Sequence, residues 1–519
     1  MRGRSAPGKG IDTSVAPCSG VDAARTSARA TVVALLLAMG MQAANLTEAV
    51  PKLIDSTPAA RTADWGIQIV DLATGKTLYE LHPDHFFVPA SNTKLFTTAL
   101  ALSRLGPEFT FLTRVVSAAP PDGHGRIAGD LRLIGQGDPN LSGRSIPYQR
   151  GAQAGNPLAA IEDLASQTVA RGVKRIEGDI VGDDTWYVWE PYAVGWAVDD
   201  PQSDDGPAVS ALAVNDNTIT LSVRPGAALG DPAALLLSPP IEFYRIANRV
   251  RTVPAGGPRA VHFSRIPGSR DAQLWGTVPL RGNGVDLLLG IDDPALYAAE
   301  ALRQALSQRG VAITGNSVAQ HAWPDDQPDL TQAAAAPAMA AETELASRVS
   351  APLLEGLRIT DKVSQNLHAE MALRAVARAR RNLGTFEAGQ EELKAFLGEV
   401  GVDPGAYNIL DGSGLTRLNL VTPAAVVKLL RFMYDSPERD HWISLLPVGG
   451  QDGTLASRFA DAGGRVHAKT GSLSHVSALS GYVQRADGSW VAFSILVNNY
   501  NGHTPEVRGV MDRICSLIE

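Results

Sequence analysis

The chain has 519 residues, of which 45% are hydrophobic and 19% charged, and its 46 basic against 54 acidic residues give a formal net charge of −8. This length exceeds one ordinary domain, so two or three domains with cores of their own are expected. The mildly acidic balance argues against nucleic acid as the main partner, because phosphate binding needs a clustered positive field. Two cysteines, Cys18 and Cys515, exclude a disulfide-rich scaffold and a structural zinc site of the CxxC type.

Residues 1–45 have the plan of a secretory signal. Arg25 and Arg29 precede a short apolar run at residues 31–41, and small residues follow that run. The run is too short for a comfortable membrane span, which needs about 20 apolar residues, and no other stretch could cross a bilayer. The segment before the run is long for a signal, and a buried N-terminal helix is the alternative. The pattern predicts an exported, periplasmic protein with no transmembrane span after signal removal.

After this segment the pattern predicts two strands, a helix and then a strand-rich region. Residues 65–72 and 76–81 read as paired strands, and residues 91–105 read as a helix that stops at Gly106-Pro107. From about residue 116 the chain changes to short strand-like pieces separated by Gly, Pro and Asp turns. These pieces include residues 129–135, 178–182, 211–223 and 285–290.

In the second half of the chain, the sequence pattern predicts a domain boundary, then helices, then strands. A helix is predicted near residues 294–309, and residues 330–343 are alanine-rich with an internal proline, which is typical of a linker. The predicted helices and strands beyond the linker are residues 366–380, 389–399, 423–434, 466–470, 477–483 and 490–498. With a last helix reaching Ile518, this order predicts an α+β fold in which one domain is interrupted by an insert.

Three short motifs carry the candidate chemistry: Ser91-Asn92-Thr93-Lys94, Ser364-Gln365-Asn366 and Lys469-Thr470-Gly471. Serine and lysine three apart on a helix share a face, and a serine hydroxyl is a weak nucleophile until a neighbouring base removes its proton. Lys94 can be that base only if burial and nearby positive charge depress its pKa, and Lys469 is a candidate for that charge. Ser364 could relay protons, and Asn366 could hold a substrate amide.

The third motif fits the binding of a carboxylate. Lys469 and Thr470 could hold the carboxylate at a strand end, and Gly471 would let the substrate backbone come close. SxxK and SxN are weak patterns, whereas KTG is rarer by chance, and the three in order are more specific than any one alone. The predicted context agrees, since Ser91 opens a helix, Ser364 precedes one and KTG ends a strand.

The ordered set resembles penicillin-recognising serine enzymes, and more closely the D-alanyl-D-alanine carboxypeptidase/endopeptidase family of penicillin-binding protein 4 type, peptidase family S13. Longer stretches are similar to that family too: residues 89–102, 130–143, 209–217, 363–374, 411–423 and 464–483. Ser91 and Ser364 are 273 positions apart, whereas β-lactamases of similar chemistry have a far shorter interval.

The resemblance implies a transpeptidase/β-lactamase-like catalytic domain, an antiparallel sheet flanked by helices, formed by residues 46–115 and 342–519. It implies a large β-rich insert at residues 116–341. It also implies that Ser91 is the acylated nucleophile, that Lys94 is its general base, and that Ser364 passes a proton toward the leaving amine.

The binding roles implied by the resemblance fall on the second and third motifs. Asn366 would contact the substrate amide, while Lys469 and Thr470, followed by Gly471, would hold the terminal carboxylate. The backbone N–H groups of Ser91 and Ser472 would form the oxyanion hole, where charge develops only in the transition state. Two positions depart from the family: Gln365 stands where Asp is usual, and His368 where an aromatic residue is common.

The expected function is that of an exported serine DD-peptidase. It would cleave D-Ala from peptidoglycan stem peptides ending in D-Ala-D-Ala, with crosslink endopeptidase activity as a further option. β-Lactam antibiotics would trap the same serine, and no metal or organic cofactor would be required. The alternatives are a serine β-lactamase, a non-catalytic penicillin-binding wall scaffold or sensor, and an esterase that uses Ser413.

Other polar groups have simpler interpretations. Ser413 lacks the GxSxG elbow, so residues 412–414 are predicted to form a turn that supports the site. His82 and His85 could ligate a metal only with a third ligand, and none is apparent. The acidic cluster at residues 199–205 lacks EF-hand spacing and is predicted to be a solvated loop.

Overall fold

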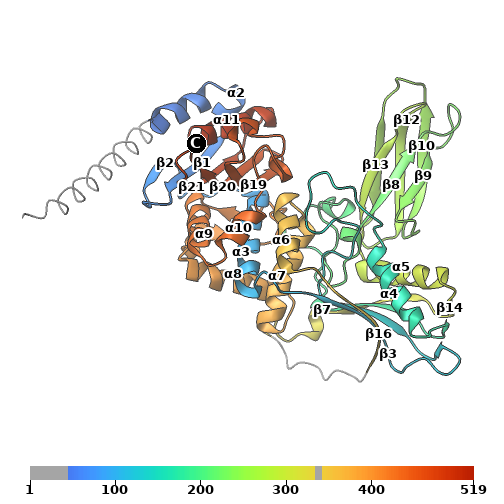
Figure 1. Cartoon of the computed structure of the whole chain (residues 1–519). Helices are drawn as coiled ribbons and strands as arrows, with labels where there is room; N and C mark the ends of the chain where they lie inside the picture. The colour runs from blue at the N-terminus through green and yellow to red at the C-terminus, as the bar shows by residue number, and fades with distance from the viewer. Residues whose placement is uncertain (1–44, 333–341) are drawn as a thin grey trace, which may run out of the picture.

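The computed structural model describes residues 45–332 and 342–519, so the signal-like segment and most of the alanine-rich linker lie outside the described residues. Figure 1 shows a part built from both ends of the described chain, in blue and in orange to red, beside a strand-rich part formed by the middle of the chain. Within the described ranges, no helix is both long and apolar enough to cross a membrane.

A five-stranded antiparallel sheet organises the part that contains both chain ends. Its order is β19-β20-β21-β1-β2, with β1 at Asp64–Asp71, β2 at Thr77–Leu81, β19 at Val466–Leu473, β20 at Val476–Gln484 and β21 at Trp490–Asn498. The side chains of β20 and β21 are buried on both faces of the sheet, which explains their continuous apolar runs. The first and last described strands therefore lie side by side.

Helices cover both faces of this sheet (Figure 1). One layer contains α3 (Thr93–Leu105), α6 (Leu353–Lys362), α7 (Asn366–Arg381), α8 (Phe386–Val400), α9 (Pro423–Asp435) and α10 (Arg439–Leu445). On the other face, α11 (Thr504–Ser516) packs against the sheet and α2 (Pro58–Arg61). Helix α3 is buried along ten consecutive residues from Thr93 to Leu102, so it runs through the core with Lys94 in its first turn.

A second five-stranded sheet, of mixed direction, organises the strand-rich part. Its order is β15-β7-β5-β3-β16, with β3 at Leu112–Ser117, β5 at Leu131–Gly135, β7 at Ile180–Val188, β15 at Ser317–Ala322 and β16 at Thr343–Val349. Strand β7 runs parallel to both of its neighbours, whereas β3 is antiparallel to β5 and β16. Helices α4 (Ala159–Ala170) and α5 (Pro294–Gln308) pack against this sheet.

Two three-stranded sheets project from the strand-rich part, at the upper right of Figure 1. Their orders are β10-β12-β11 and β13-β8-β9, and their inner faces share one apolar core. The bounds are β8 Thr218–Arg224, β9 Ala234–Ser238, β10 Arg245–Val253, β11 Ala260–Arg265, β12 Asp271–Pro279 and β13 Val285–Gly290. Short strands form two further small sheets: β4 (Arg126–Ile127), β6 (Arg175–Ile176) and β14 (Ala312–Ile313), and β17 (Tyr407–Asn408) with β18 (Leu420–Val421).

The predicted α+β fold with an antiparallel sheet flanked by helices is confirmed, but the sequence pattern does not predict α4, α6 and α10. In α4 the buried residues Ile161, Leu164, Ala165 and Thr168 follow the helical spacing i, i+3, i+4, i+7. This signal is short and lies among strand-like pieces, which is why it was read as part of a β-rich region. The domain division stays a prediction, and β3 and β16, which lie at its two boundaries, pair with each other.

Candidate active site

Ser91 lies in a single 3-10 turn, η1 (Ala90–Asn92), directly before α3. It therefore precedes the long helix, whereas the sequence predicted that it opens it. Ala90 has φ of 47°, in the left-handed region that a right-handed helix cannot include, so the helix cannot extend back through it. A Cβ at Gly414 would lie only 1.9 Å from the Ala90 carbonyl oxygen, so a glycine there lets the two segments touch.

Lys94 is fully buried and points at three oxygens. Its Nζ lies 2.9 Å from Ser91 Oγ, 2.6 Å from Asn366 Oδ1 and 2.7 Å from the Ser413 carbonyl oxygen. Burial, and next the positive charge of Lys469, lower the pKa of Lys94 to about 7, against the opposite effect of three buried carboxylates. A substantial fraction of this amine is therefore uncharged near neutral pH.

A second buried lysine faces the other serine of the site. Lys469 Nζ donates to Ser364 Oγ at 2.8 Å and to the Thr470 carbonyl oxygen at 2.9 Å. Burial lowers the pKa of Lys469 to about 8, while the carboxylate of Asp361 raises it. Ser364 has φ of 63°, a left-handed conformation just before α7 that directs its hydroxyl to Lys469.

Asn366 connects Lys94 to the strand-rich part. It is the first residue of α7, and Gln365 caps this helix by accepting a hydrogen bond from the Leu367 N–H at 3.0 Å. Asn366 Oδ1 accepts from Lys94, and its Nδ2 donates to the Asp205 carbonyl oxygen at 2.8 Å. Its amide is therefore fixed by one contact on each side.

The KTG motif lies inside β19, which continues to Leu473 and pairs with β20 as far as Val476. The prediction that the motif ends its strand is thus wrong, because the turn comes only after Leu473. A Cβ at Gly471 would lie 2.6 Å from the Pro89 carbonyl oxygen and 3.1 Å from the Ser91 nitrogen. The glycine is therefore required by the chain's own backbone, which brings β19 against the segment that holds Ser91.

An open cleft of about 490 Å³ lies over these groups. It is lined by Ser91, Asp200, Asp205, Val363, Ser364, Asn366, Gly414, Leu415, Thr454, Thr470, Ser472 and Leu473. At its edge Thr470 donates to Thr454 Oγ1 at 2.8 Å, and Arg508 donates to Ser472 Oγ at 2.7 Å. Of the predicted site residues, the serines, Asn366, Thr470 and Ser472 line the cleft, while both lysines lie beneath it and Gly471 lies against the Ser91 segment.

The acidic loop at residues 199–205 is exposed at Asp199, Asp204 and Asp205, as expected of a solvated loop, whereas Asp200 is half-buried. Asp200 and Asp205 also line the cleft, which the sequence did not predict, and burial raises the pKa of Asp200. The loop is fixed from behind by Arg265, whose guanidinium donates to the Pro201 carbonyl oxygen at 3.1 Å and whose N–H donates to Gln202 Oε1 at 2.9 Å. Such long-range contacts leave no trace in a local pattern.

Two buried carboxylates hold the turn between β17 and β18, and sequence reasoning missed both. Glu370 Oε1 accepts from the N–H groups of Gly412 and Ser413 at 2.9 and 2.8 Å, and burial raises the pKa of Glu370 to about 7. Asp411 accepts from the N–H groups of Gly414 and Thr416 at 2.7 and 2.8 Å. Together they fix the Ser413 carbonyl oxygen that contacts Lys94. The only signal was the glycine-rich turn itself.

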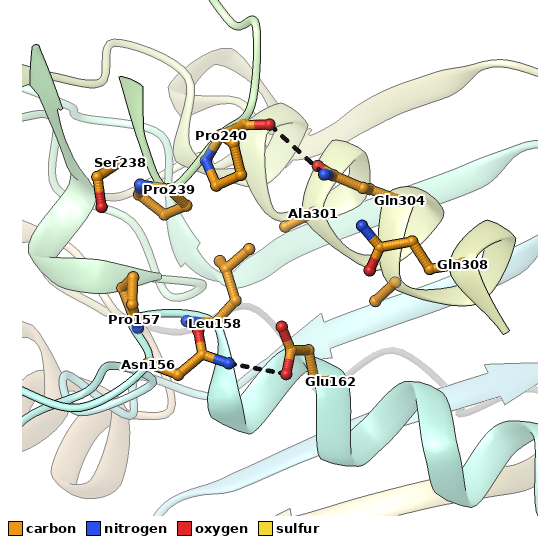
Figure 2. A pocket seen from close by; sticks show the side chains of 11 residues that line it. Asn156, Pro157, Leu158, Glu162, Ser238, Pro239, Pro240, Ala301, Gln304 and Gln308 are labelled. Atoms are coloured by element: carbon orange, nitrogen blue, oxygen red, sulfur yellow. Dashed lines mark hydrogen bonds between the residues drawn. The ribbon is translucent and has the colours of Figure 1, made fainter. Parts of the chain in front are cut away.

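The remaining candidates lie outside the cleft. The Ser413 side chain is fully buried and its Oγ donates to Asp411 at 3.3 Å, so it presents no free hydroxyl to a substrate. The rings of His82 and His85 stack at 4.7 Å, and no group of three His, Cys, Asp or Glu in the described ranges is placed to hold a metal ion. A smaller cavity of about 130 Å³ lies between α4 and α5, and Figure 2 shows that it contains no motif residue.

A serine beside a buried amine of lowered pKa, facing a second serine–lysine pair at the edge of an antiparallel sheet, is the arrangement of a serine enzyme of the penicillin-recognising class. The chain belongs to the D-Ala-D-Ala carboxypeptidase 3 (S13) family, whose model matches residues 46–517. The resemblance noted from the motifs is thereby confirmed, and with it the class of serine-type D-Ala-D-Ala carboxypeptidases.

Individual relatives are similar to this chain over most of its length. It is 35% identical over 485 residues to the D-alanyl-D-alanine carboxypeptidase of Actinomadura sp. (strain R39), covering 91% of this chain and 84% of the relative. It is 26% identical over 427 residues to the carboxypeptidase DacB of Haemophilus influenzae, covering 80% and 81%. The crystal structure of penicillin binding protein 4 from Haemophilus influenzae has the same fold, with a TM-score of 0.75 at 22% identity over 90% of this chain and 98% of that one.

Proposed function

We propose that this protein removes the terminal D-Ala from peptidoglycan stem peptides through an acyl-enzyme on Ser91. The observation that carries the proposal is the contact of 2.9 Å between Lys94 Nζ and Ser91 Oγ, made by an amine whose pKa is lowered to about 7. A base poised near the working pH combines the correct protonation state with the ability to accept a proton.

The three contacts of Lys94 assign a direction to its lone pair. An uncharged amine carries two N–H bonds and one lone pair, and the carbonyl oxygens of Asn366 and Ser413 can only accept. Both N–H bonds are therefore used on these two oxygens, and the lone pair faces the hydroxyl of Ser91. Lys94 is thus oriented to take the proton as Ser91 Oγ attacks the peptide carbonyl carbon.

The proposed reaction then proceeds in two balanced steps. The tetrahedral oxyanion is held by the N–H groups of Ser91 and Ser472, and its collapse breaks the peptide bond and releases D-Ala, whose amine takes the proton from Lys94 through Ser364. Water next attacks the ester carbonyl carbon of the acyl-enzyme and gives a proton to the uncharged Lys94. The bond to Ser91 Oγ then breaks, Ser91 takes the proton back from Lys94, and the shortened peptide leaves with a new carboxyl group. Lys469 is within 2.8 Å of Ser364 Oγ, so the same cation that assists this proton relay lies where the terminal carboxylate would bind beside Thr470.

We further propose that the substrate ends in D-Ala-D-Ala, that β-lactam antibiotics acylate Ser91, and that the protein works in the periplasm. The support is the edge of the cleft where a lysine and a threonine hydroxyl, Lys469 and Thr470, lie together, the crystal structure of penicillin binding protein 4 from Haemophilus influenzae in complex with a β-lactam, and the signal-like pattern of residues 1–45. Cleavage of crosslinks between stem peptides would use the same groups on a longer leaving amine.

Labelling with a fluorescent penicillin tests the proposal, with wild type, Ser91→Ala and Ser413→Ala compared and the adduct mapped by peptide sequencing. The label is expected on Ser91 in wild type and in folded Ser413→Ala. No label is expected in Ser91→Ala. Release of D-Ala from a soluble D-Ala-D-Ala peptide is measured beside penicillin hydrolysis. Labelling that survives in Ser91→Ala contradicts the assignment, penicillin turnover as fast as acylation identifies a β-lactamase, and acylation without D-Ala release identifies a sensor.

A further inference from the structure

The outer face of the projecting sheet β10-β12-β11 carries an aromatic and basic row. In the paired strands, Arg249 lies opposite Trp275, and Trp275 lies opposite His262. The Trp275 side chain is 42% exposed although it lies in the middle of the sheet, and its ring is stacked with that of His262 at 5.5 Å and 22°. With strands about 4.8 Å apart, the row spans about 10 Å, a length comparable with two linked sugar rings.

This face is strongly basic in an acidic chain. Residues 245–270 contain six arginines and no Asp or Glu, whereas the whole chain has a net charge of −8. Arg265 and Arg270 are used internally, since they pair with Asp292 and Glu300, and Arg245 pairs with Asp271 on the same sheet. Arg249, Arg251 and Arg259 are exposed, and none of the three pairs with an acidic side chain in the described parts of the chain. Arg251 makes one long contact, of 3.5 Å, with the Gly230 carbonyl oxygen, so the guanidinium groups of all three remain accessible to an anionic partner.

The same strands are connected to the wall of the catalytic cleft. His262 and Arg265 are three residues apart on β11, which is about 10 Å along a strand. Arg265 is the residue that holds Pro201 and Gln202, directly next to the cleft-lining Asp200. Because His262 and Arg265 lie on opposite faces of β11, this strand connects the exposed row to the loop that lines the cleft.

We propose that the outer face of β10-β12-β11 docks a stretch of the glycan strand of peptidoglycan that has lost its stem peptides, with a hexosamine ring stacked on Trp275 and its carboxylates beside Arg249 and Arg251. The flat face of a sugar ring carries C–H groups that pack on an indole. The lactyl groups supply free carboxylates only where the amide bonds to the stem peptides have been cleaved. Tryptophan and arginine are the residues that contribute most at binding surfaces. The choice of polymer rests on the proposed function, because the site acts on the peptides that this polymer carries.

Binding of full-length protein to glycan strands freed of their stem peptides by an amidase tests the proposal. The variants are Trp275→Ala, Trp275→Tyr and Arg249→Glu, and the matched control is Trp323→Ala, which removes another exposed indole of the strand-rich part. Trp275→Ala and Arg249→Glu are each expected to raise the dissociation constant about tenfold, and Trp275→Tyr and Trp323→Ala to leave it nearly unchanged. Added salt is expected to weaken glycan binding by wild type more than glycan binding by Arg249→Glu.

Release of D-Ala from a soluble peptide is measured on the same samples and is expected to be equal in all of them. If wild type does not release D-Ala, the proposed function is contradicted but the docking proposal is not, because glycan binding is measured separately. Equal retention of Trp275→Ala, Arg249→Glu and wild type on the glycan overturns the docking proposal. It is also overturned if wild type binds only strands that keep their stem peptides, if a single-stranded oligonucleotide binds this face more tightly, or if Trp275→Ala instead dissolves a dimer.

Discussion

The positive charge of Lys469 acts on Lys94, and this gives a test by pH. Burial, and next the charge of Lys469, lower the pKa of Lys94 to about 7, while burial lowers the pKa of Lys469 to about 8. The rate constant kcat/KM for D-Ala release is expected to rise through about pH 7 as Lys94 loses its proton, and to fall above about pH 8 as Lys469 loses the charge that holds the carboxylate. In Lys469→Met the rising limb of the residual activity should move to higher pH, because the repulsion is gone.

Substitution of Asp361 is expected to shift the pH profile in the opposite direction and serves as the control. Its buried carboxylate raises the pKa of both lysines. In Asp361→Asn both limbs of the profile should therefore move to lower pH. A rising limb that stays at the same pH in Lys469→Met and in Asp361→Asn would show that Lys94 is not the group being titrated.

Gly471 gives a steric test of how closely β19 must approach Ser91. In Gly471→Ala the new Cβ would lie 2.6 Å from the Pro89 carbonyl oxygen, so the Ser91 segment must shift. Such overpacking costs about 1–3 kcal/mol of unfolding free energy, and acylation by penicillin is expected to slow at least in proportion. The control is Gly509→Ala, on α11 with nothing within 4 Å of the new atom. Thermal unfolding and stopped-flow acylation measure the two effects, and an unchanged acylation rate in Gly471→Ala would contradict this account.

At the scale of elements, His321 connects two strands and a helix of the strand-rich part: β15, β7 and α5. It lies on β15, its Nδ1 is 2.8 Å from Asp184 of β7, and its Nε2 is 3.8 Å from Asp293, the N-cap of α5. Burial opposes its charged form, but the two carboxylates raise the pKa of His321 from 6.5 to about 9. Because the folded-state pKa is raised, this stabilisation is complete below about pH 6.5 and is lost as the pH rises through 9.

The melting temperature therefore gives a readout at the element scale. Wild type should lose more stability between pH 6.5 and 9 than His321→Gln, in which this pair of ionic contacts is absent at every pH. His441→Gln, which changes an exposed ring on α10, is the control and should follow wild type. Parallel curves for wild type and His321→Gln would show that the imidazolium does not tie β15 to β7 and α5.

The sequence predicted those elements and residues whose signal is local. Strands β20 and β21, the start of α7, and the motif residues Ser91, Lys94 and Lys469 follow from apolar runs, cap patterns and residue chemistry. The positions of Glu370 and Asp411 could not be predicted, because they act on backbone N–H groups of a turn distant in sequence. The register of the strands could not be predicted either. Pairing with β20 extends the strand that contains KTG to Leu473, and the local sequence does not show this pairing.

At the scale of the whole molecule, the strand-rich part touches the groups that surround Lys94. Asp205 accepts from Asn366, and Trp196 Nε1 donates to Asp411 Oδ2 at 3.1 Å. The Trp196 ring also packs with Leu367 of α7, in a small cluster formed by both parts of the chain. The strand-rich part is therefore a support of the site as well as a wall of its cleft.

Trp196→Phe tests that support, since phenylalanine keeps most of the packing and removes only the hydrogen bond to Asp411. A hydrogen bond to a charged group contributes about 1.5–3 kcal/mol, and a loss of this size is expected in urea unfolding. Trp196 does not line the cleft, so kcat should fall while KM stays close to that of wild type, because the turn that presents the Ser413 carbonyl to Lys94 loosens. Trp323→Phe, on the same part but remote from Asp411, should change neither. If Trp196→Phe instead raises KM with kcat intact, the strand-rich part serves the cleft as a binding wall and leaves the base untouched.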